Sequence, residues 1–366
     1  MQVNLKNERI KRRYLKWLRE AKGYSEMTIR SIEQAIWQYE DFTQNANYMT
    51  FNQSKAVGFK KWLEARIYRG RPISITTAYH YLRHLRDFFV WLSGQPGYKS
   101  RISLDNVSYL SLDRKKVREA TAPRQPKFPS LEYVKKLVSS IEVHNEIDQR
   151  DRALVAFLLL SGMRDKAIIT LPLGCFNRES LQISQDTKRG VDTKFGKSFV
   201  STLLRFDDKL TDIVIKWSEY LEKEKMFGSA DPLFPRSKIQ QVKDGFSFEA
   251  KEVEPIFWRG TGSLREILKV RAGKTGVEYH RPHSFRHAAV HLAMKFCRTA
   301  EEIKAVSQNL GHENIGTTLM TYGTLDQFRV AEVIRNTDFS AGPQDTNNHN
   351  GIKLLEHLLD RLKKKR

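Results

Sequence analysis

The stretch LGHENIGTTLMTYG, residues 310–323, joins a Gly-His pair to a tyrosine ten residues further on. Small and β-branched residues lie between His312 and Tyr322. A tyrosine hydroxyl has an ordinary pKa of about 10, and it becomes a useful nucleophile when cations stabilise its phenolate. Tyr322 is therefore a candidate nucleophile, provided that the rest of the chain supplies the cations.

Two further stretches supply them: SGMRDKAI at residues 161–168 and RPHSFRHAAVH at residues 281–291. They contain Arg164, His283 and Arg286, and the three-residue spacing of the last two puts both on one helical face. Two planar guanidinium groups can hold the non-bridging oxygens of a phosphodiester by bidentate bonds, and histidines add hydrogen bonds or proton transfer. The combined set fits phosphoryl transfer on a nucleic acid backbone, although each motif alone is also consistent with a surface arginine or a helix cap.

The overall charge agrees with a nucleic acid partner. Lys and Arg outnumber Asp and Glu by 63 to 42, which gives a formal charge of +21. Such a surplus attracts polyanions, and nucleic acid is the first candidate. A solvated basic surface, or association with ribosomes or membranes, would explain the charge less specifically.

Cysteine content and hydropathy indicate the compartment. Cys175 and Cys297 are far apart in apolar settings, which is typical of small buried hydrophobes in a reducing compartment. The N-terminus lacks the apolar core of a signal peptide, and the longest apolar run, ALVAFLLL at residues 153–160, is too short to span a bilayer. We expect a soluble cytoplasmic protein without membrane contact, associated with the nucleoid if the host is bacterial.

A chain of 366 residues is too long for one ordinary core, so we expect two domains. Residues 1–112 read as short helices. The helix expected in SITTAYHYLRHLRDFFVWL has a polar side with donors suited to phosphate or base edges, although a solvated face explains them equally well. The candidate DNA contacts on this helix are Thr76, Thr77, His80, Arg83 and His84.

A basic segment with three prolines, DRKKVREATAPRQPKFP at residues 113–129, is predicted to be an extended linker. Its charge would let it follow a phosphate backbone between two domains that form a clamp, with Lys115 and Lys116 as candidate contacts.

Residues 130–335 are predicted to form the catalytic domain, and LQIS and SFVSTLL within them have β character. The expected fold is mainly α, with a small antiparallel sheet in this second domain. Residues 336–366 combine a polar linker with a leucine-striped amphipathic helix, which would dock on its own domain or on a neighbouring subunit.

A metal site is the main alternative interpretation of the histidines. His283, His287 and His291 recur every four residues, with His280 just upstream. Zinc peptidases, however, need a Glu beside the first His and a third ligand, whereas Ser284 follows His283 here. We therefore predict no metal site.

Taken together, the motifs resemble those of the tyrosine recombinase family, the phage-integrase type of site-specific DNA recombinases. The resemblance rests on the Arg of SGMR, the H-x-x-R of PHSFRH, and LGH followed by TT and a Tyr, in that order. In addition, YLKWLREAKGYSEMTIRSIEQAIWQYEDF resembles that family's helical core-binding domain.

The resemblance implies a role for each matching residue. Arg164 and Arg286 would be the clamp arginines, His283 the proton-transfer histidine, and His312 a second ligand of the scissile phosphate. Tyr322 would be the nucleophile that forms a 3′-phosphotyrosyl link and frees a 5′-hydroxyl. A hairpin lysine acts as general acid in the family, and in TKFGKSF the best match is Lys194, with Lys188 and Lys197 as rivals.

Two departures from the family pattern stand out. Ala167 occupies the position of an acid three residues after the first arginine, and Tyr322 lies one residue later after Gly-His than is usual. The resemblance further implies double-stranded DNA as substrate, a tetramer on DNA, a mobile element as source, and no cofactor. Two other functions remain open, namely a type IB topoisomerase-like nicking and closing enzyme and a catalytically silent DNA-binding regulator.

Overall fold

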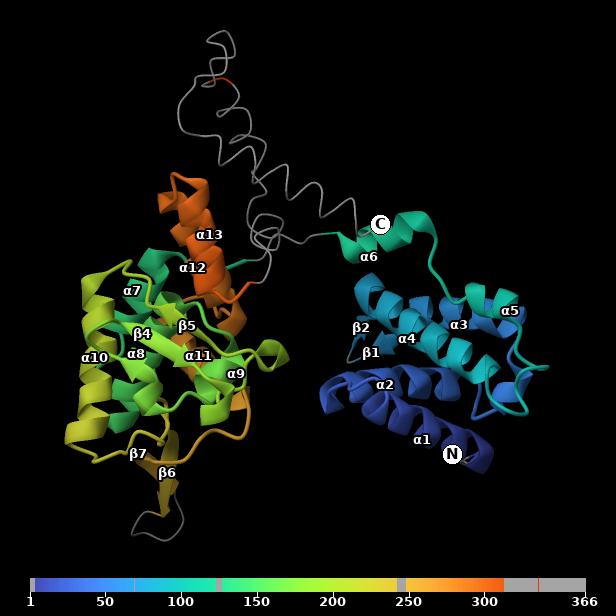
Figure 1. Ribbon diagram of the computed structural model, residues 1–366, viewed down its shortest axis with the longest axis horizontal. Coiled ribbons are helices and arrows are strands. Elements are labelled where there is room, and N and C mark those ends of the chain that lie inside the picture. The colour runs from blue at the N-terminus through green and yellow to red at the C-terminus, as the bar shows by residue number, and fades with distance from the viewer. Residues whose placement is uncertain (1–3, 69, 123–126, 242–247, 313–334, 336–366) are drawn as a thin grey trace. The chain divides into compact units, whose positions relative to one another are not determined.

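The computed structural model describes residues 4–68, 70–122, 127–241, 248–312 and 335. The chain divides into two compact units, unit 1 (Met1–Arg124) and unit 2 (Gln125–Arg366) (Figure 1). Among these described residues, no helix has both the length and the apolar character needed to cross a membrane.

Unit 1 is a helical bundle whose core contains many packed aromatic side chains. Tyr39 contacts Phe59 and Phe89 edge to face, with ring centroids 5.4 and 5.2 Å apart. Ser25 caps the second helix by accepting a hydrogen bond from the Thr28 amide, as its sequence position predicts. The elements are α1 (Leu5–Glu20), α2 (Glu26–Phe42), η1 (Tyr48–Thr50), α3 (Gln53–Ala65), β1 (Ile67–Tyr68), β2 (Arg71–Pro72), α4 (Ile75–Ser93), α5 (Leu104–Ser108) and α6 (Arg114–Thr121).

Helix α6 corrects the prediction of an extended segment at residues 113–129, because its eight residues are helical. The Asp113 side chain caps the helix by accepting from the Lys116 amide. Thr76 Oγ1 on α4 donates to the Ala120 carbonyl over 3.2 Å, so α6 is fastened to unit 1. The prolines that favoured an extended chain, at positions 123, 126 and 129, all follow the end of the helix.

Unit 2 has helices around a three-stranded antiparallel sheet in the order β3-β4-β5. Ile183 of β4 pairs with Ser201 of β5, within the two segments predicted to be strands. The mainly α fold with a small antiparallel sheet is thus confirmed. The elements are α7 (Leu131–Ser139), α8 (Glu146–Ser161), α9 (Asp165–Ile169), η2 (Leu173–Cys175), β3 (Phe176–Asn177), β4 (Gln182–Gln185), η3 (Thr187–Arg189), η4 (Lys194–Gly196), β5 (Phe199–Thr202), α10 (Asp208–Lys223), β6 (Arg236–Gln241), β7 (Phe248–Glu254), α11 (Gly262–Thr275), α12 (Pro282–Phe296) and α13 (Ala300–Asn309).

Helix α8 lies in the centre of unit 2 and is buried on nearly every side, as its apolar run predicts. Near its N-terminal end it also carries buried charges that are paired. Arg271 of α11 donates to Asp151 and Asp148 over 2.8 and 2.7 Å, and Arg150 donates to Asp151 over 2.7 Å. Because each buried charge has a partner, the network fixes α11 against α8.

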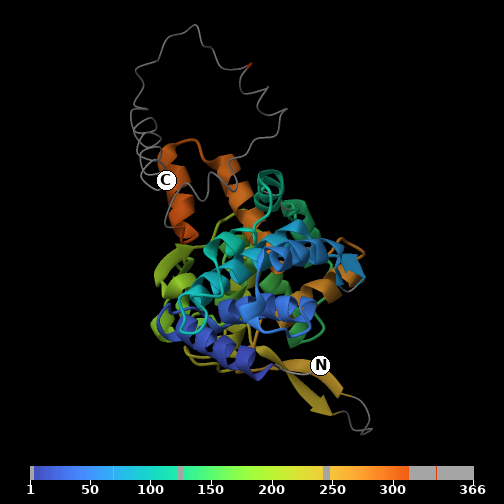
Figure 2. The same cartoon turned by 90° about the vertical axis from the view of Figure 1, so that its right-hand side faces the viewer.

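The β6–β7 hairpin was not predicted from the sequence. It extends away from the body of unit 2, as the two views in Figures 1 and 2 show. Its strands carry cross-strand ion pairs, Arg236 with Glu254 and Lys238 with Glu252. Polar residues on both sides of the strands remove the alternation of apolar and polar residues by which such a strand is recognised.

Candidate active site

Arg286 connects the three helix ends that form the candidate site. The residue is 4% exposed, and its guanidinium donates from Nη1 to the Gly162 carbonyl over 2.6 Å. Nη2 donates to the Leu310 carbonyl and to His312 Nε2, each over 2.8 Å. Gly162 follows α8, Arg286 lies on α12, and Leu310 follows α13. One side chain therefore brings together the three sequence motifs.

Both glycines beside this arginine are required by their surroundings. Gly162 ends α8 with φ 54°, and a Cβ there would meet Leu310 Cδ2 at 2.8 Å. Gly311 has φ 67°, and a Cβ would meet the Phe199 ring at 2.5 Å. A larger residue at either position would be strained in its backbone and would also displace a neighbour. His312 is thereby held close to strand β5, on which Phe199 lies.

Arg164 and His283 belong to the same electrostatic environment. Arg164 is the N-cap residue of α9 and is partly buried, and His283 lies in the first turn of α12. Burial lowers the pKa of His283, and the charges of Arg286 and Arg164 lower it further. The sequence motifs predict that these side chains share one site, and the structure brings them within electrostatic reach of one another.

His312 has the more strongly shifted pKa. Burial, followed by the charges of Arg286, Arg164 and Lys194, lowers it to about 4. His312 is therefore neutral at pH 7, which agrees with an Nε2 atom that accepts from Arg286. A site with three cations and an uncharged His312 is suited to an anionic ligand such as a phosphodiester.

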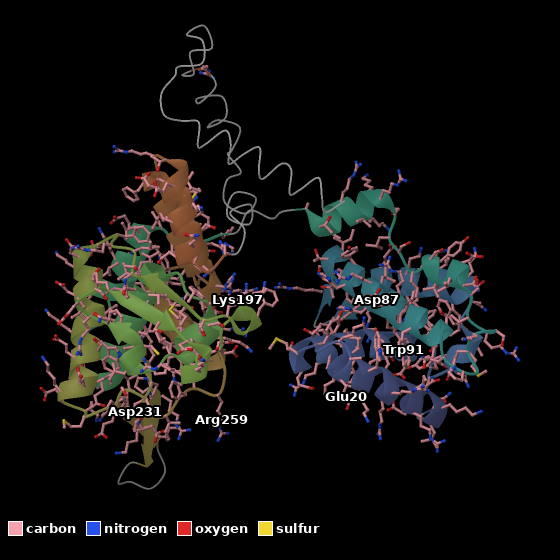
Figure 3. The ribbon with its side chains drawn as sticks, viewed as in Figure 1. Glu20, Asp87, Trp91, Lys197, Asp231 and Arg259 are labelled. Carbon is pink, nitrogen blue, oxygen red and sulfur yellow. The ribbon has the colours of Figure 1, made fainter. Side chains whose placement is uncertain are left out.

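Lys194 is the hairpin lysine whose charge acts on His312. It lies in the turn between β4 and β5, and its Nζ is 4.8 Å from the centre of the Phe195 ring. Lys188 and Lys197 lie in the same connection, and all three lysines are exposed; Lys197 is labelled in Figure 3. The charge of Lys194 thus links this turn electrostatically to His312.

The candidate DNA contacts of unit 1 lie on α4 and α6. His80 and Arg83 are exposed on α4, whereas His84 is half-buried and its pKa is lowered by burial and by Arg83. Two of the predicted DNA contacts make hydrogen bonds within unit 1. Thr76 binds the Ala120 carbonyl, and the Thr77 hydroxyl lies 2.8 Å from Ser74 Oγ in the helix cap.

On α6, Lys115 is exposed, and the Lys116 ammonium pairs with Glu64.

Tyr322 and the amphipathic segment at residues 352–362 lie outside the described residues.

A family comparison identifies the kind of protein to which this site belongs. Residues 130–328 match the model of the phage integrase family, which is more than half of the chain. The chain belongs to the phage integrase family. The matched segment contains the three motifs that Arg286 joins.

Relatives from bacteria agree with this assignment. The tyrosine recombinase XerD of Listeria innocua serovar 6a is 23% identical over 332 residues, which cover 88% of this chain and 96% of that protein. The tyrosine recombinase XerC of Lactobacillus delbrueckii subsp. bulgaricus is 22% identical over 311 residues, 84% of this chain and 92% of that protein. The chain is accordingly a DNA recombinase enzyme.

Solved structures share the fold. A lambda integrase dimer bound to a core site superposes with a TM-score of 0.59 at 14% identity, and covers 87% of this chain and 98% of that one. XerH recombinase on a palindromic difH substrate gives a TM-score of 0.56 at 17% identity, over 88% of this chain and 83% of that one.

The groups that position the motif residues could not be predicted from the sequence. The acceptors of Arg286 are backbone carbonyls, which have no sequence signal. Asn309 was also missed: its Nδ2 donates to the Thr202 carbonyl over 2.9 Å, and its Oδ1 accepts from the Thr202 amide over 2.6 Å. Only the proximity of α13 and β5 in the fold reveals that contact.

Proposed function

We propose that this recombinase cuts and rejoins double-stranded DNA at specific sites through a 3′-phosphotyrosyl intermediate on Tyr322. The observation that carries the proposal is the Arg286 cluster, in which one buried guanidinium is joined to the SGMR loop and to the LGH loop. Tyr322 follows the LGH loop by ten residues, so a short segment connects it to this cluster.

In the proposed cleavage step, Tyr322 Oη attacks the scissile phosphorus while the bond from phosphorus to the 5′ oxygen breaks. His283 accepts the phenolic proton, which suits a histidine whose pKa lies below its ordinary value. Lys194 donates a proton to the departing 5′ oxygen. Religation reverses each transfer: the 5′ hydroxyl attacks, Lys194 recovers its proton, and the tyrosine leaves protonated.

Arg164 and Arg286 would stabilise the charge that gathers on the non-bridging oxygens. His312 would add a hydrogen bond. Because a bound phosphate is anionic, it opposes the cations that now lower the pKa of His312, and a protonated Nε2 could then donate to the phosphate. The exchange of one phosphoester for another conserves the free energy of the bond, so religation consumes no nucleotide.

Recombination of two duplexes requires four strand cleavages, and we propose a tetramer on DNA for that reason. We further propose that the protein acts as the integrase of a mobile element. Solved structures of similar fold include lambda integrase and the Tn1549 transposon integrase, whereas the curated relatives above are Xer recombinases. Joining of sites on separate DNA molecules, rather than resolution of two sites on one, would support the integrase role.

A covalent-trapping assay tests the chemistry. Native protein and Tyr322→Phe are incubated in EDTA with a duplex pool of random sequence, enriched by rounds of binding, and the reactions are stopped with SDS. We expect DNA attached to the native protein alone, at a junction with a free 5′ hydroxyl. Attachment in both proteins would remove Tyr322 from its proposed role. Cleavage that requires added Mg²⁺ would overturn the mechanism.

The DNA that becomes attached to the native protein, called the captured DNA below, also distinguishes a recombinase from a topoisomerase-like enzyme and from a DNA-binding regulator. A topoisomerase-like enzyme would relax a supercoiled plasmid that carries one captured site but would not join two sites. A DNA-binding regulator would bind the site without attachment. We expect exchange of flanking DNA between two sites, read by amplification across the new junctions.

A further inference from the structure

The turn that carries Lys194 has an aromatic residue in a backbone conformation that aromatic residues avoid. Phe195 has φ 64° and ψ 18°, and Gly196 follows with φ 65°. The left-handed region favours glycine and tolerates asparagine, whereas a bulky residue there is a real outlier. The turn is closed by the Thr193 hydroxyl, which donates to the Lys197 carbonyl over 2.7 Å.

Packing does not explain the phenylalanine. Its side chain is 78% exposed, so it contributes little to the core of unit 2. Strained residues concentrate at functional sites, where the side chain has a use that offsets the unfavourable backbone. The ring contacts the neighbouring ammonium, since Lys194 Nζ lies 4.8 Å from the ring centre.

A ring in that position acts on a lysine in two ways. The face of an aromatic ring attracts a cation, which stabilises the charged ammonium. The contact also restricts a long side chain that would otherwise sample many rotamers, so less freedom is lost when the lysine is placed for reaction. The charge of Lys194 also acts on His312, so the lysine lies within electrostatic reach of the candidate site.

We propose that Phe195 is a positioning residue, whose ring holds the Lys194 ammonium at the hairpin tip for donation to the leaving 5′ oxygen. This inference rests on the proposed function, in which Lys194 is the general acid. It predicts a defect confined to the step in which the bond from phosphorus to the 5′ oxygen breaks.

Three substitutions of Phe195 separate the effect of its aromatic ring from the effect of its backbone conformation. Phe195→Tyr keeps the ring, Phe195→Leu keeps apolar bulk without a ring, and Phe195→Asn removes both but suits the left-handed backbone. We expect single-turnover cleavage of the captured duplex at the native rate for the Tyr variant and about two- to fivefold slower for the Leu and Asn variants. Phe296→Asn, at an equally exposed phenylalanine of α12, is the control and should be unaffected.

A second substrate identifies the step. In it, sulfur replaces the bridging 5′ oxygen at the scissile position, and the departing thiolate needs no proton. Lys194→Ala, Phe195→Leu and Phe195→Asn should all cleave this duplex as fast as the native protein. Native-rate cleavage of the oxygen substrate by Phe195→Asn would overturn the proposal, as would a defect that persists on sulfur while Lys194→Ala is rescued.

Different results would contradict the general-acid role of Lys194 and the positioning role of Phe195. If Lys194→Ala is not rescued by sulfur, the general-acid assignment itself is wrong, and the role of Phe195 falls with it. A measurement without DNA checks the contact directly. In the full chain with ¹³C-dimethylated lysines, the Lys194 signal should be shifted upfield by the ring and should return to its ordinary position in Phe195→Leu. An unshifted native signal would overturn the contact on which the proposal stands.

Discussion

At the scale of single residues, the proposed chemical role of Arg286 and its structural role can be separated by Arg286→Lys. The lysine keeps the charge but cannot reach two carbonyls and His312 with one planar fork. Because the site is buried, we expect the free energy of unfolding of unit 2 to fall by about 3 kcal/mol, and cleavage to slow by about 100-fold or more.

Urea unfolding followed by intrinsic fluorescence measures the first effect, and single-turnover cleavage measures the second. Arg259→Lys is the matched control, since Arg259 is exposed on the same unit (Figure 3). Native stability in Arg286→Lys would mean that the carbonyls find other donors, and the structural role of the arginine would then be refuted.

The histidines give the stability of unit 2 a dependence on pH whose sign follows from their pKa values. Burial, His283 and Arg286 lower the pKa of His287 to about 4, and that of His312 is also about 4. In the unfolded chain a histidine titrates at about 6.5, so the unfolded state binds more protons between these values. Stability is therefore complete above pH 6.5 and is lost as the pH falls toward 4.

Urea midpoints between pH 7.5 and 4.5 test this dependence. We expect the midpoint for unit 2 to stay level down to about pH 6.5 and to fall below it, with a smaller slope in His287→Asn, which removes one of the titrating groups. His144→Asn is the control, because His144 is exposed on the same unit. Equal slopes in the native protein and His287→Asn would show that this histidine is not held neutral by the fold.

The residues that could be predicted from the sequence are those whose chemistry is visible in their type. Arg164, His283, Arg286 and His312 were recognised by motif, and the structure joins them by contact or by charge. Asn309 could not be recognised, because a lone asparagine at the end of a helix is ordinary. Its partner, Thr202, is 107 positions away in the chain.

At the scale of elements, the site depends on how α13 is fastened to β5. Asn309 imitates a strand neighbour by bonding both the amide and the carbonyl of Thr202, and Gly311 lies against the Phe199 ring of the same strand. Strand β5 also leads back to the turn with Lys194. The contact therefore couples the loop of His312 to the hairpin of the proposed general acid.

Asn309→Ala breaks this coupling without touching a reacting group. We expect the free energy of unfolding of unit 2 to fall by about 1 kcal/mol and cleavage to slow by about tenfold, because His312 is no longer held in place. Gln308→Ala, an exposed neighbour on the same helix, should match the native protein in both assays. A stability loss with a native cleavage rate would limit Asn309 to a structural role.

Two elements escaped prediction for opposite reasons. Helix α6 was hidden by the prolines that follow it, although Asp113 provides a cap and its sequence has no helix breaker. The β6–β7 hairpin was hidden by its own composition, since ion pairs such as Lys238 with Glu252 occupy positions that the strand pattern expects to be apolar. By contrast, β4 and β5 contain the buried Ile183 and Ser201 and were predicted.

At the scale of the whole molecule, the charge of +21 predicts how DNA affinity depends on salt. When a protein neutralises roughly six to ten DNA phosphates, its affinity for DNA falls about 10³- to 10⁵-fold as the salt concentration rises from about 50 to 200 mM. Fluorescence anisotropy on a 40-base-pair duplex of arbitrary sequence measures this nonspecific term. Affinity that is independent of salt would show that the excess charge faces away from the DNA.

The two lysines of α6 refine that prediction, because their surroundings differ. Lys115 is exposed, whereas the charge of Lys116 is already balanced by Glu64. A lysine on the phosphate backbone releases about one counterion, so Lys115→Ala should reduce the slope of log affinity against log salt by about 0.9. Lys116→Ala should reduce it less, since Glu64 competes with the phosphates for that ammonium. An unchanged slope in both variants would place α6 off the DNA, and a larger effect at Lys116 would mean that its pair with Glu64 opens when DNA binds.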